Sequence, residues 1–196
     1  MSAPYEILAG PVTVWLAAAS TAEVDVDTTP SGSWTKLGTS GSDNYSEDGV
    51  TVTHEQSIET FRALGTTGNR KAWRTEEEHM VEFEIMDLTA ELYAKALNDA
   101  SITTTAAGSG TPGSKSIPLL QGHDVTLYAL LARTEGQSPY GDAWNAQYWI
   151  PVCYQSENAE VVFKKGEPAG LKFKFAALED ATDGFGVYRP QTATAL

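Results

Sequence analysis

The chain has 196 residues, enough for one domain with its own hydrophobic core. Its 26 acidic and 13 basic residues give a formal charge of −13, which argues against a protein that grips nucleic-acid phosphates. Cys153 is the single cysteine, so an intrachain disulfide is excluded, and no apolar run reaches the roughly 18 residues of a membrane-spanning helix. We expect one domain over residues 1–196 that does not contact a membrane.

The N-terminal part predicts two short strands. Val12–Ala18 alternates in the period of a strand, and Trp34–Leu37 follows an acidic loop. Residues 1–9 are expected to form an N-terminal arm. The start of the chain lacks the basic segment of a signal peptide, so we expect the protein to begin in a cytoplasm.

A long hairpin is the most distinctive prediction. Val50–Leu64 and Trp73–Asp87 both alternate, and both exceed the usual strand length. Gly65–Ala72 between them contains two glycines and an asparagine, which favours a turn. Residues 60–73 should therefore form the extended end of this hairpin.

One helix and several further strands complete the predicted elements. Asp87–Asn98 has a helical apolar stripe, with Asp87 as its expected N-cap. Residues 101–116 are rich in Thr, Ala, Gly, Ser and Pro and should form a flexible loop. The remaining expected segments are the strands Val125–Ala132 and Ala146–Gln155 with the polar loop Arg133–Asn145 between them, the hairpin of Ala159–Lys164 and Gly170–Leu178, and a C-terminal arm over residues 179–196.

This order of elements predicts a mainly β fold. We expect a β-sandwich of two packed antiparallel sheets, with one flanking α-helix and the long hairpin extending from it.

Catalytic and metal-binding patterns are missing from the sequence. His54, His79 and His123 lack the spacing that places two ligands on one helix face, although His54 and His79 could be neighbours on paired strands and hold zinc. The acidic pairs at 25 and 27 and at 180 and 183 do not match an EF-hand loop. We therefore expect neither an enzyme nor a protein with a metal or cofactor.

Alternation sorts the hairpin residues into an apolar face and an acidic face. A solvated outer face is the simplest explanation, but such faces usually mix both signs, and the segment from Glu76 to Asp87 contains no Lys or Arg. The acidic face comprises Glu55, Glu59, Glu76, Glu78, Glu82 and Glu84. Basic residues gather instead toward the far end of the hairpin, at Arg62, Arg70, Lys71 and Arg74.

Several short motifs resemble, in their order, the major tail tube proteins of bacteriophages with long, flexible, non-contractile tails. The motifs are Gly10–Ala18, Ser33–Gly38, Glu47–Thr53, Val81–Ile85 followed by a helix, and Lys165–Phe173. The similarity covers most of residues 10–178, while residues 101–145 match nothing distinctive.

The resemblance implies a structural virion protein, assembled in the bacterial host cytoplasm. It implies a hexameric ring whose inner sheets join into a β-barrel, and rings that stack into a tube with tape-measure, tail terminator and tail-tip proteins as partners. Viral DNA would pass through the lumen without specific binding, and the acidic face would line that lumen. The basic residues of the hairpin would contact Asp43, Glu47 and Asp48 of a neighbouring subunit or ring. The alternatives are a secreted carbohydrate-binding β-sandwich, another virion protein such as a capsid decoration or baseplate component, and, more distantly, a hydrolase.

Overall fold

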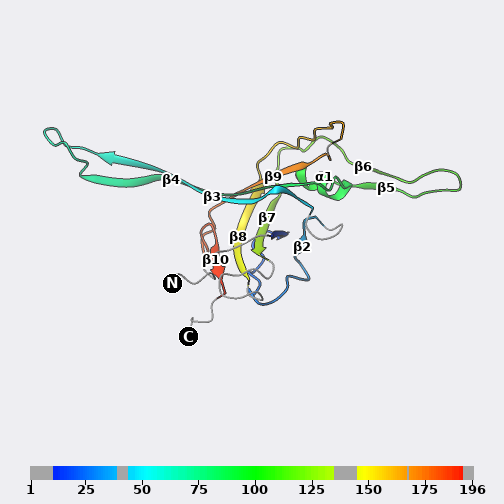
Figure 1. Ribbon diagram of the computed structural model, residues 1–196, viewed down its shortest axis with the longest axis horizontal. Helices are drawn as coiled ribbons and strands as arrows, with labels where there is room; N and C mark the ends of the chain where they lie inside the picture. The colour runs from blue at the N-terminus through cyan, green and yellow to red at the C-terminus, as the bar shows by residue number, and fades with distance from the viewer. Residues whose placement is uncertain (1–10, 39–43, 135–144, 167, 192–196) are drawn as a thin grey trace.

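The computed structural model describes residues 11–38, 44–134, 145–166 and 168–191 (Figure 1). Within these ranges it contains ten strands and one helix. The strands are β1 (Val12–Ala18), β2 (Thr35–Lys36), β3 (Tyr45–Phe61), β4 (Lys71–Ile85), β5 (Thr103–Thr105), β6 (Ser114–Ser116), β7 (Leu127–Thr134), β8 (Ala146–Gln155), β9 (Leu171–Ala177) and β10 (Val187–Pro190), and the helix is α1 (Ala90–Ala96). The expectation of a mainly β chain is confirmed.

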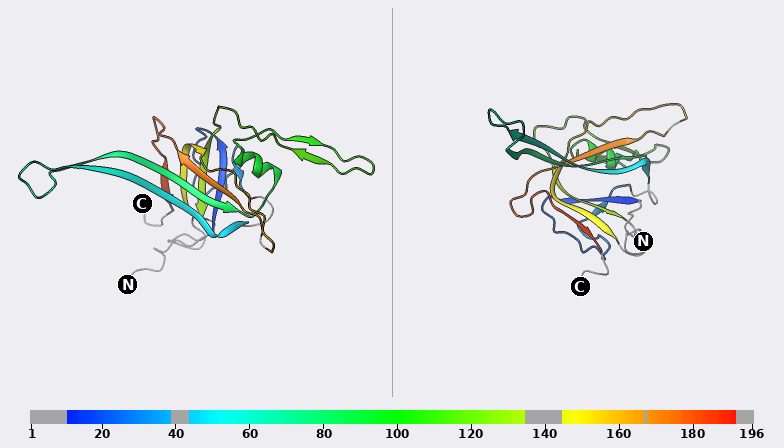
Figure 2. Two further views of the ribbon diagram at one scale, coloured as in Figure 1. Left: turned by 90° about the horizontal axis from the view of Figure 1, so that it is seen from above. Right: turned by 60° about the vertical axis from the view of Figure 1, so that its left-hand side comes forward.

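Eight of the strands form one continuous antiparallel sheet rather than the two separate sheets that we expected. The order is β2-β1-β7-β8-β9-β4-β3, and β10 also pairs with β8. Strand β8 makes this continuity possible, because β7 pairs with one of its edges and β9 pairs with its last three residues on the other. On that second edge, the N-terminal residues of β8 pair with β10 instead. Pro151, which has no N–H to donate, lies between those two pairings. The sheet bends there, and Figure 2 shows the two resulting layers.

The hydrophobic core lies between these layers. Alternate residues of β4 and β9 point inward, and the rings of Phe83, Phe173 and Phe175 stack on one another. The ring of Tyr128 meets Phe175 edge-on from the opposite layer. The Tyr45 hydroxyl accepts a hydrogen bond from the N–H of Val14 at 2.9 Å, so it also joins β3 to β1. The period-2 pattern thus places the base of the long hairpin over the core.

Helix α1 begins later than the sequence predicted. Its N-cap is Thr89, whose hydroxyl accepts a hydrogen bond from the N–H of Leu92, whereas we expected Asp87. Asp87 accepts a hydrogen bond from the Asn44 side chain instead. Leu88 falls within the predicted helical segment but is 41% exposed because it precedes α1. The side chains that the helix buries are Leu92, Ala94 and Ala96.

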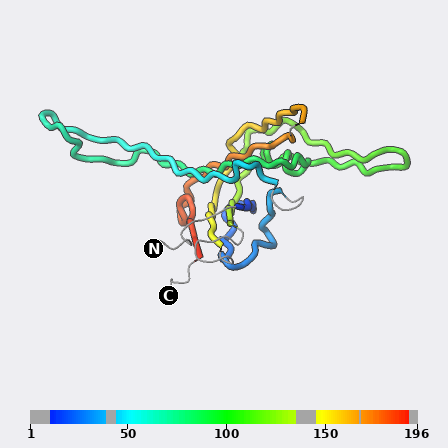
Figure 3. Tube along the Cα trace, in the orientation of Figure 1, coloured from blue at the N-terminus to red at the C-terminus, as the bar shows by residue number. Residues whose placement is uncertain are grey.

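Two ribbons project in opposite directions from the body of the molecule. The β3–β4 hairpin extends to the left in Figure 3, and the β5–β6 ribbon extends to the right. Residues 101–116, expected to be a flexible loop, therefore contain a small two-stranded sheet whose strand residues are all exposed. Lys115 forms an ion pair with Glu91, which connects this ribbon to α1.

The C-terminal segment differs from the arm that we expected over residues 179–196. Strand β10 pairs with the N-terminal half of β8, and Tyr188 lies opposite Tyr148. Residues 179–186 turn back toward the body, with reciprocal backbone hydrogen bonds between Asp180 and Gly184. Residues 192–196 and the expected N-terminal arm lie outside the described residues. In the expected last hairpin, Val161 makes only an isolated bridge to Leu171.

Candidate assembly surface

The β3–β4 hairpin leaves the body just beyond its buried residues. Val81 is fully buried and pairs with Val52, whereas most residues farther along both strands are exposed. A β-bulge follows the pair of Ser57 and Glu76, and Ile58 then lies opposite Arg74. Two layers of packing therefore support the base of the hairpin, and its outer half stands alone (Figure 1).

Strand β3 is the last strand of the large sheet, and its outer edge is open. It pairs with β4 on one side, and no strand within the described ranges pairs with its other side. An edge strand of this kind presents a row of backbone N–H and C=O groups to any strand that comes alongside. At 17 residues β3 is also the longest strand described, so the exposed edge is long.

The register of the hairpin brings acidic residues together on one exposed face. Glu55 lies directly opposite Glu78, and Ser57 lies opposite Glu76. Glu82 and Glu84 follow at alternate positions of β4, toward the body. Glu59 has the same parity along β3, but it lies beyond the bulge, opposite Trp73. The bulge therefore separates Glu59 from the other five residues of the predicted acidic face.

Two lysines of β9 share this face and were missed in the sequence. Lys174 pairs with Glu82, and Lys172 pairs with Glu84. The segment from Glu76 to Asp87 does lack basic residues, but its neighbouring strand supplies them. The like-charged part of the face is therefore confined to Glu55, Glu76 and Glu78, which lie beyond the reach of β9 pairing.

The predicted basic residues of the hairpin divide into two groups. Arg74 donates hydrogen bonds to Gln56 and Glu77, so its charge is paired with a carboxylate of the same hairpin. Arg62 donates to the Asn69 side chain across the turn. Arg70 and Lys71 are exposed near the tip.

The acidic partners predicted for these residues lie elsewhere. Glu47 and Asp48 are exposed near the start of β3, at the opposite end of the hairpin. Asp43 lies outside the described residues. Within one chain the hairpin tip is therefore apart from Glu47 and Asp48, and a contact with these two acids would require a second copy.

The hairpin tip also exposes large apolar side chains, which sequence reasoning did not identify. Leu64 is fully exposed, at 107%, and Phe61 is 54% exposed. Ile58 and Trp73, nearer the bulge, are exposed by 55% and 41%. Exposed apolar groups gathered on a projecting element are typical of a surface that another protein covers.

A groove lies where the other face of the hairpin meets the body. His54 and His79 are cross-strand partners with ring centroids 5.9 Å apart. The ring of His79 continues to Tyr148 at 6.3 Å, and Tyr148 lies 4.5 Å from the ring of Tyr188. The groove beside this row of rings has a volume of about 470 Å³. Its remaining walls come from Val52, Glu77, Trp149, Phe185, Gly186 and Val187.

Two titratable groups of the groove have displaced pKa values. Burial lowers the pKa of His79, and the nearby His54 lowers it further. The pKa of Glu77 is also lowered, chiefly by the hydrogen bond that His54 donates to its carboxylate at 2.6 Å. The arrangement favours a neutral His79 beside an ionised Glu77.

The geometry does not support the hypothesis of a zinc site at His54 and His79. Across the described residues, no three His, Cys, Asp or Glu side chains gather in a way that would hold a metal ion. In the same part of the chain, no helix combines the length and apolar character needed to cross a membrane.

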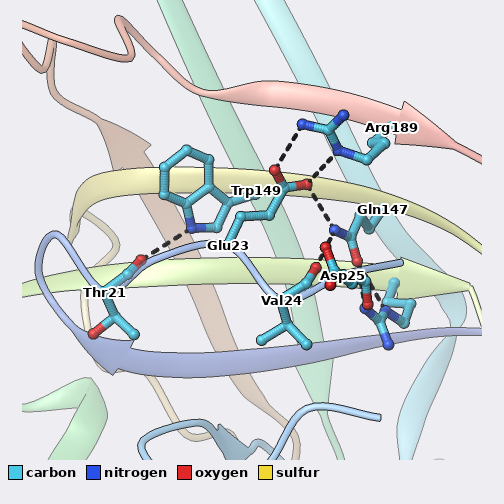
Figure 4. Close-up of polar contacts among 8 residues, drawn as sticks. Thr21, Glu23, Val24, Asp25, Gln147, Trp149 and Arg189 are labelled. Carbon is cyan, nitrogen blue, oxygen red and sulfur yellow. Dashed lines mark hydrogen bonds and ion pairs between the residues drawn. The ribbon is translucent and has the colours of Figure 1, made fainter. Parts of the chain in front are cut away.

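A polar network on the outer side of β8 fixes the C-terminal strand (Figure 4). Glu23 accepts two hydrogen bonds at 2.9 Å from Arg189 of β10 and one at 2.7 Å from the Gln147 side chain. Burial opposes ionisation of Glu23, but these hydrogen bonds outweigh it and lower the pKa of the carboxyl. The loop that carries Glu23 is also held by the Trp149 indole, which donates to the carbonyl of Thr21.

Arg133 occupies the buried part of this network, although we expected it in a polar loop. It is only 4% exposed, and it donates to the side-chain oxygen of Gln147 and to the carbonyls of Asp25 and Thr28. Gln147 is completely buried and connects Arg133 to Glu23. The network thus joins β7, β8, β10 and the loop after β1.

Comparisons with known proteins do not assign the chain to a family: no family model matches it, and no curated protein matches it. The chain's own surfaces therefore provide the clues to its function. The most distinctive are the open edge of β3, the acidic face of the hairpin, its apolar tip and the groove at its base.

Proposed function

We propose that this protein is a structural virion subunit that builds the tail tube of a long-tailed bacteriophage. The carrying observation is the position of Glu55, Glu76 and Glu78 on one exposed face of a long hairpin at the open edge of the sheet. Like charges placed together on a sheet cost stability. A shared channel through which DNA passes without binding would explain why this cost is tolerated.

Ring closure follows from the edge strand. In the proposed assembly, β3 of each subunit pairs with the sheet of the next, and six copies join their inner sheets into one barrel. Closed rotational symmetry repeats one heterologous contact, which would leave no open edge on β3. Stacked rings then form the tube, with tape-measure, tail terminator and tail-tip proteins as partners.

The dimensions suit a DNA channel. At the base of the hairpin, the last residues of β8 together with β9, β4 and β3 make four neighbouring strands, whereas only β3 and β4 continue to Glu55, Glu76 and Glu78. Six copies would give about 24 strands, and a spacing of about 4.8 Å with a tilt of about 40° gives a backbone diameter of roughly 48 Å. Inward side chains would leave on the order of 35 Å, which is wide enough for B-form DNA. The acidic wall would repel phosphate, so the DNA would slide through without binding.

Electron microscopy of the purified full-length protein tests the proposal directly. We expect rings or tubes with sixfold symmetry, and a density map in which Glu55, Glu76 and Glu78 face the central channel. A protein that stays monomeric at high concentration, or an assembly that places these carboxylates on its outer surface, would overturn it.

A further inference from the structure

The apolar tip of the hairpin and the groove at its base have complementary shapes and chemistry. The tip presents Phe61 and Leu64 on a narrow two-stranded projection. The groove is about 470 Å³ in volume, and apolar or aromatic side chains including Val52, Tyr148 and Val187 form much of its wall. Covering such groups removes apolar surface from water, which is favourable in proportion to the area buried.

A hairpin cannot reach the groove of its own chain. His54 lines the groove, and Leu64 is ten residues farther along the strand and its turn. At about 3.3 Å per residue, the tip lies on the order of 30 Å away from the groove. The β3–β4 pairing runs continuously from Val50 to Phe61, apart from the one bulge, so the hairpin does not fold back. The partner must be another molecule.

The charges around the two surfaces also match. Arg62, Arg70 and Lys71 surround the tip with positive charge. The turn that leads into the groove wall carries Glu179, Asp180 and Asp183. Backbone hydrogen bonds from Asp180 to Gly184 and from Gly186 to Asp183 hold this acidic turn next to the groove residues. Complementary charge at the rim of an apolar contact directs which partner binds and how it is oriented.

We propose that the hairpin tip of one copy docks into the groove of a second copy, with Phe61 and Leu64 against the aromatic wall and the basic tip against the acidic turn. The contact is heterologous, so each molecule both donates a tip and accepts one. The inference rests on the proposed function only in requiring that copies of the chain associate. It identifies the groove as the acceptor surface. Of the acidic partners expected from the sequence, the described residues Glu47 and Asp48 do not line this groove.

Disulfide trapping tests the contact. Cys153 is fully buried and its burial raises the thiol pKa, so it does not compete with exposed engineered cysteines. Separate Leu64→Cys and Val187→Cys proteins are mixed, oxidised and analysed by non-reducing electrophoresis and mass spectrometry. We expect a Leu64–Val187 cross-link several times more abundant than in a control mixture of Leu64→Cys with Leu120→Cys, since Leu120 is more exposed than Val187, at 88% against 39%, but lies outside the groove.

Equal yields in the two mixtures would overturn the docking proposal. Electron microscopy of the same samples separates this failure from that of the proposed function. Rings or tubes without the specific cross-link would leave the tube function standing and remove the groove as the acceptor. Unassembled protein without the cross-link would remove both.

A charge exchange provides the second test. Arg70→Glu with Lys71→Glu should weaken association by at least tenfold at low salt. Adding Glu179→Lys and Asp183→Lys should restore most of it, because the attraction is re-formed with reversed signs. Association that is unaffected by the first pair, or not rescued by the second, would contradict docking at this groove. Analytical ultracentrifugation over a range of concentrations measures both effects.

Discussion

Glu55 of β3 lies directly opposite Glu78 of β4 on the exposed face of the hairpin, and no basic residue shares this level of the two-strand pairing. Opposed like charges on paired strands are destabilising by about 0.2–1 kcal/mol. We predict that Glu78→Gln raises the free energy of unfolding of the free subunit by this amount at low salt. Urea denaturation followed by circular dichroism measures it.

Glu82→Gln is the matched control, because Glu82 lies on the same strand and face but opposite Lys174. Removing the Glu82 carboxylate should leave the free energy of unfolding unchanged or lower it slightly. The difference between the two variants should shrink in about 1 M salt, where the screening length falls to about 3 Å. A stabilising effect of equal size in both variants would mean that the face behaves as uniformly repulsive.

The lowered pKa of His79 predicts a pH dependence of stability. The ordinary value is 6.5, and burial followed by the proximity of His54 depresses it in the folded protein. The unfolded chain therefore binds more protons between the two pKa values, so the free energy of unfolding falls as pH drops through about 6.5 and levels off below the folded pKa. Thermal melts from pH 8 to pH 5 should show this loss.

His79→Phe keeps an aromatic ring against Tyr148 but cannot be protonated, so its melting temperature should decline less over the same pH range. His123→Gln, at an exposed histidine, should behave as the wild type. The carboxyl of Glu77 has a pKa below its ordinary 4.5, so it affects stability only at more acidic pH. Parallel declines in wild type and His79→Phe would exclude His79 as the source.

Gly186 should be the most sensitive glycine near the C-terminus. Its φ is +110°, and an added Cβ would lie 1.9 Å from the carbonyl oxygen of Trp149, which is backbone and cannot move aside. We predict that Gly186→Ala lowers the free energy of unfolding by at least ~2 kcal/mol, from backbone strain and disturbed β8–β10 pairing. Gly184→Ala should cost less, because its φ is +59° and no atom lies within 4 Å of the added carbon. Similar losses in the two variants would show that the Trp149 contact does not matter.

Gln147 is predicted to contribute more to stability than Arg189, although both bind Glu23. Gln147→Leu would remove the two hydrogen bonds that the buried Arg133 guanidinium donates to the Gln147 side chain, at a cost of about 2–3 kcal/mol. Arg189→Gln removes an exposed partner, and exposed ion pairs contribute only about 0–1 kcal/mol. Urea denaturation of both variants would reveal the order, and a larger loss in Arg189→Gln would contradict it.

Local patterns predicted the long hairpin well, because alternation within one strand depends only on the period of the backbone. The pairing of Glu55 with Glu78 involves only two strands that are consecutive in the sequence. Lys172 and Lys174 could not be assigned to the same face, since the partner of β9 depends on a strand order that no local pattern encodes. The register therefore agrees with the predicted parity for Glu55, Glu76, Glu78, Glu82 and Glu84, whereas the bulge separates Glu59, and the net charge of the face was overestimated.

The residues whose structure was predicted wrongly have partners that are distant in the sequence. Arg133 follows an apolar run and was expected in a loop, but carbonyls more than 100 positions away allow its burial. Strand β10 contains only four residues and ends in Pro190, so its own sequence carries a weak strand signal, and pairing with β8 decides its structure. At the helix start, Asp87 and Thr89 are both acceptable caps, and the contact of Asp87 with Asn44 favours Thr89.

The bend at β8 has a mechanical consequence. Between β8 and β9, the paired residues are Cys153 with Ala177, Tyr154 with Ala176 and Gln155 with Phe175, and single backbone hydrogen bonds from Ser156 to Lys174 and from Leu178 to Val152 flank them. A pull on the hairpin would pass through β4 to β9 along six residue pairs, and then across this seam of three. The shorter ladder would yield first under shear, so the outer layer would peel away as a unit while β1, β7 and β8 stay paired. The protein would therefore extend under load in two stages, with the first rupture at Cys153–Gln155.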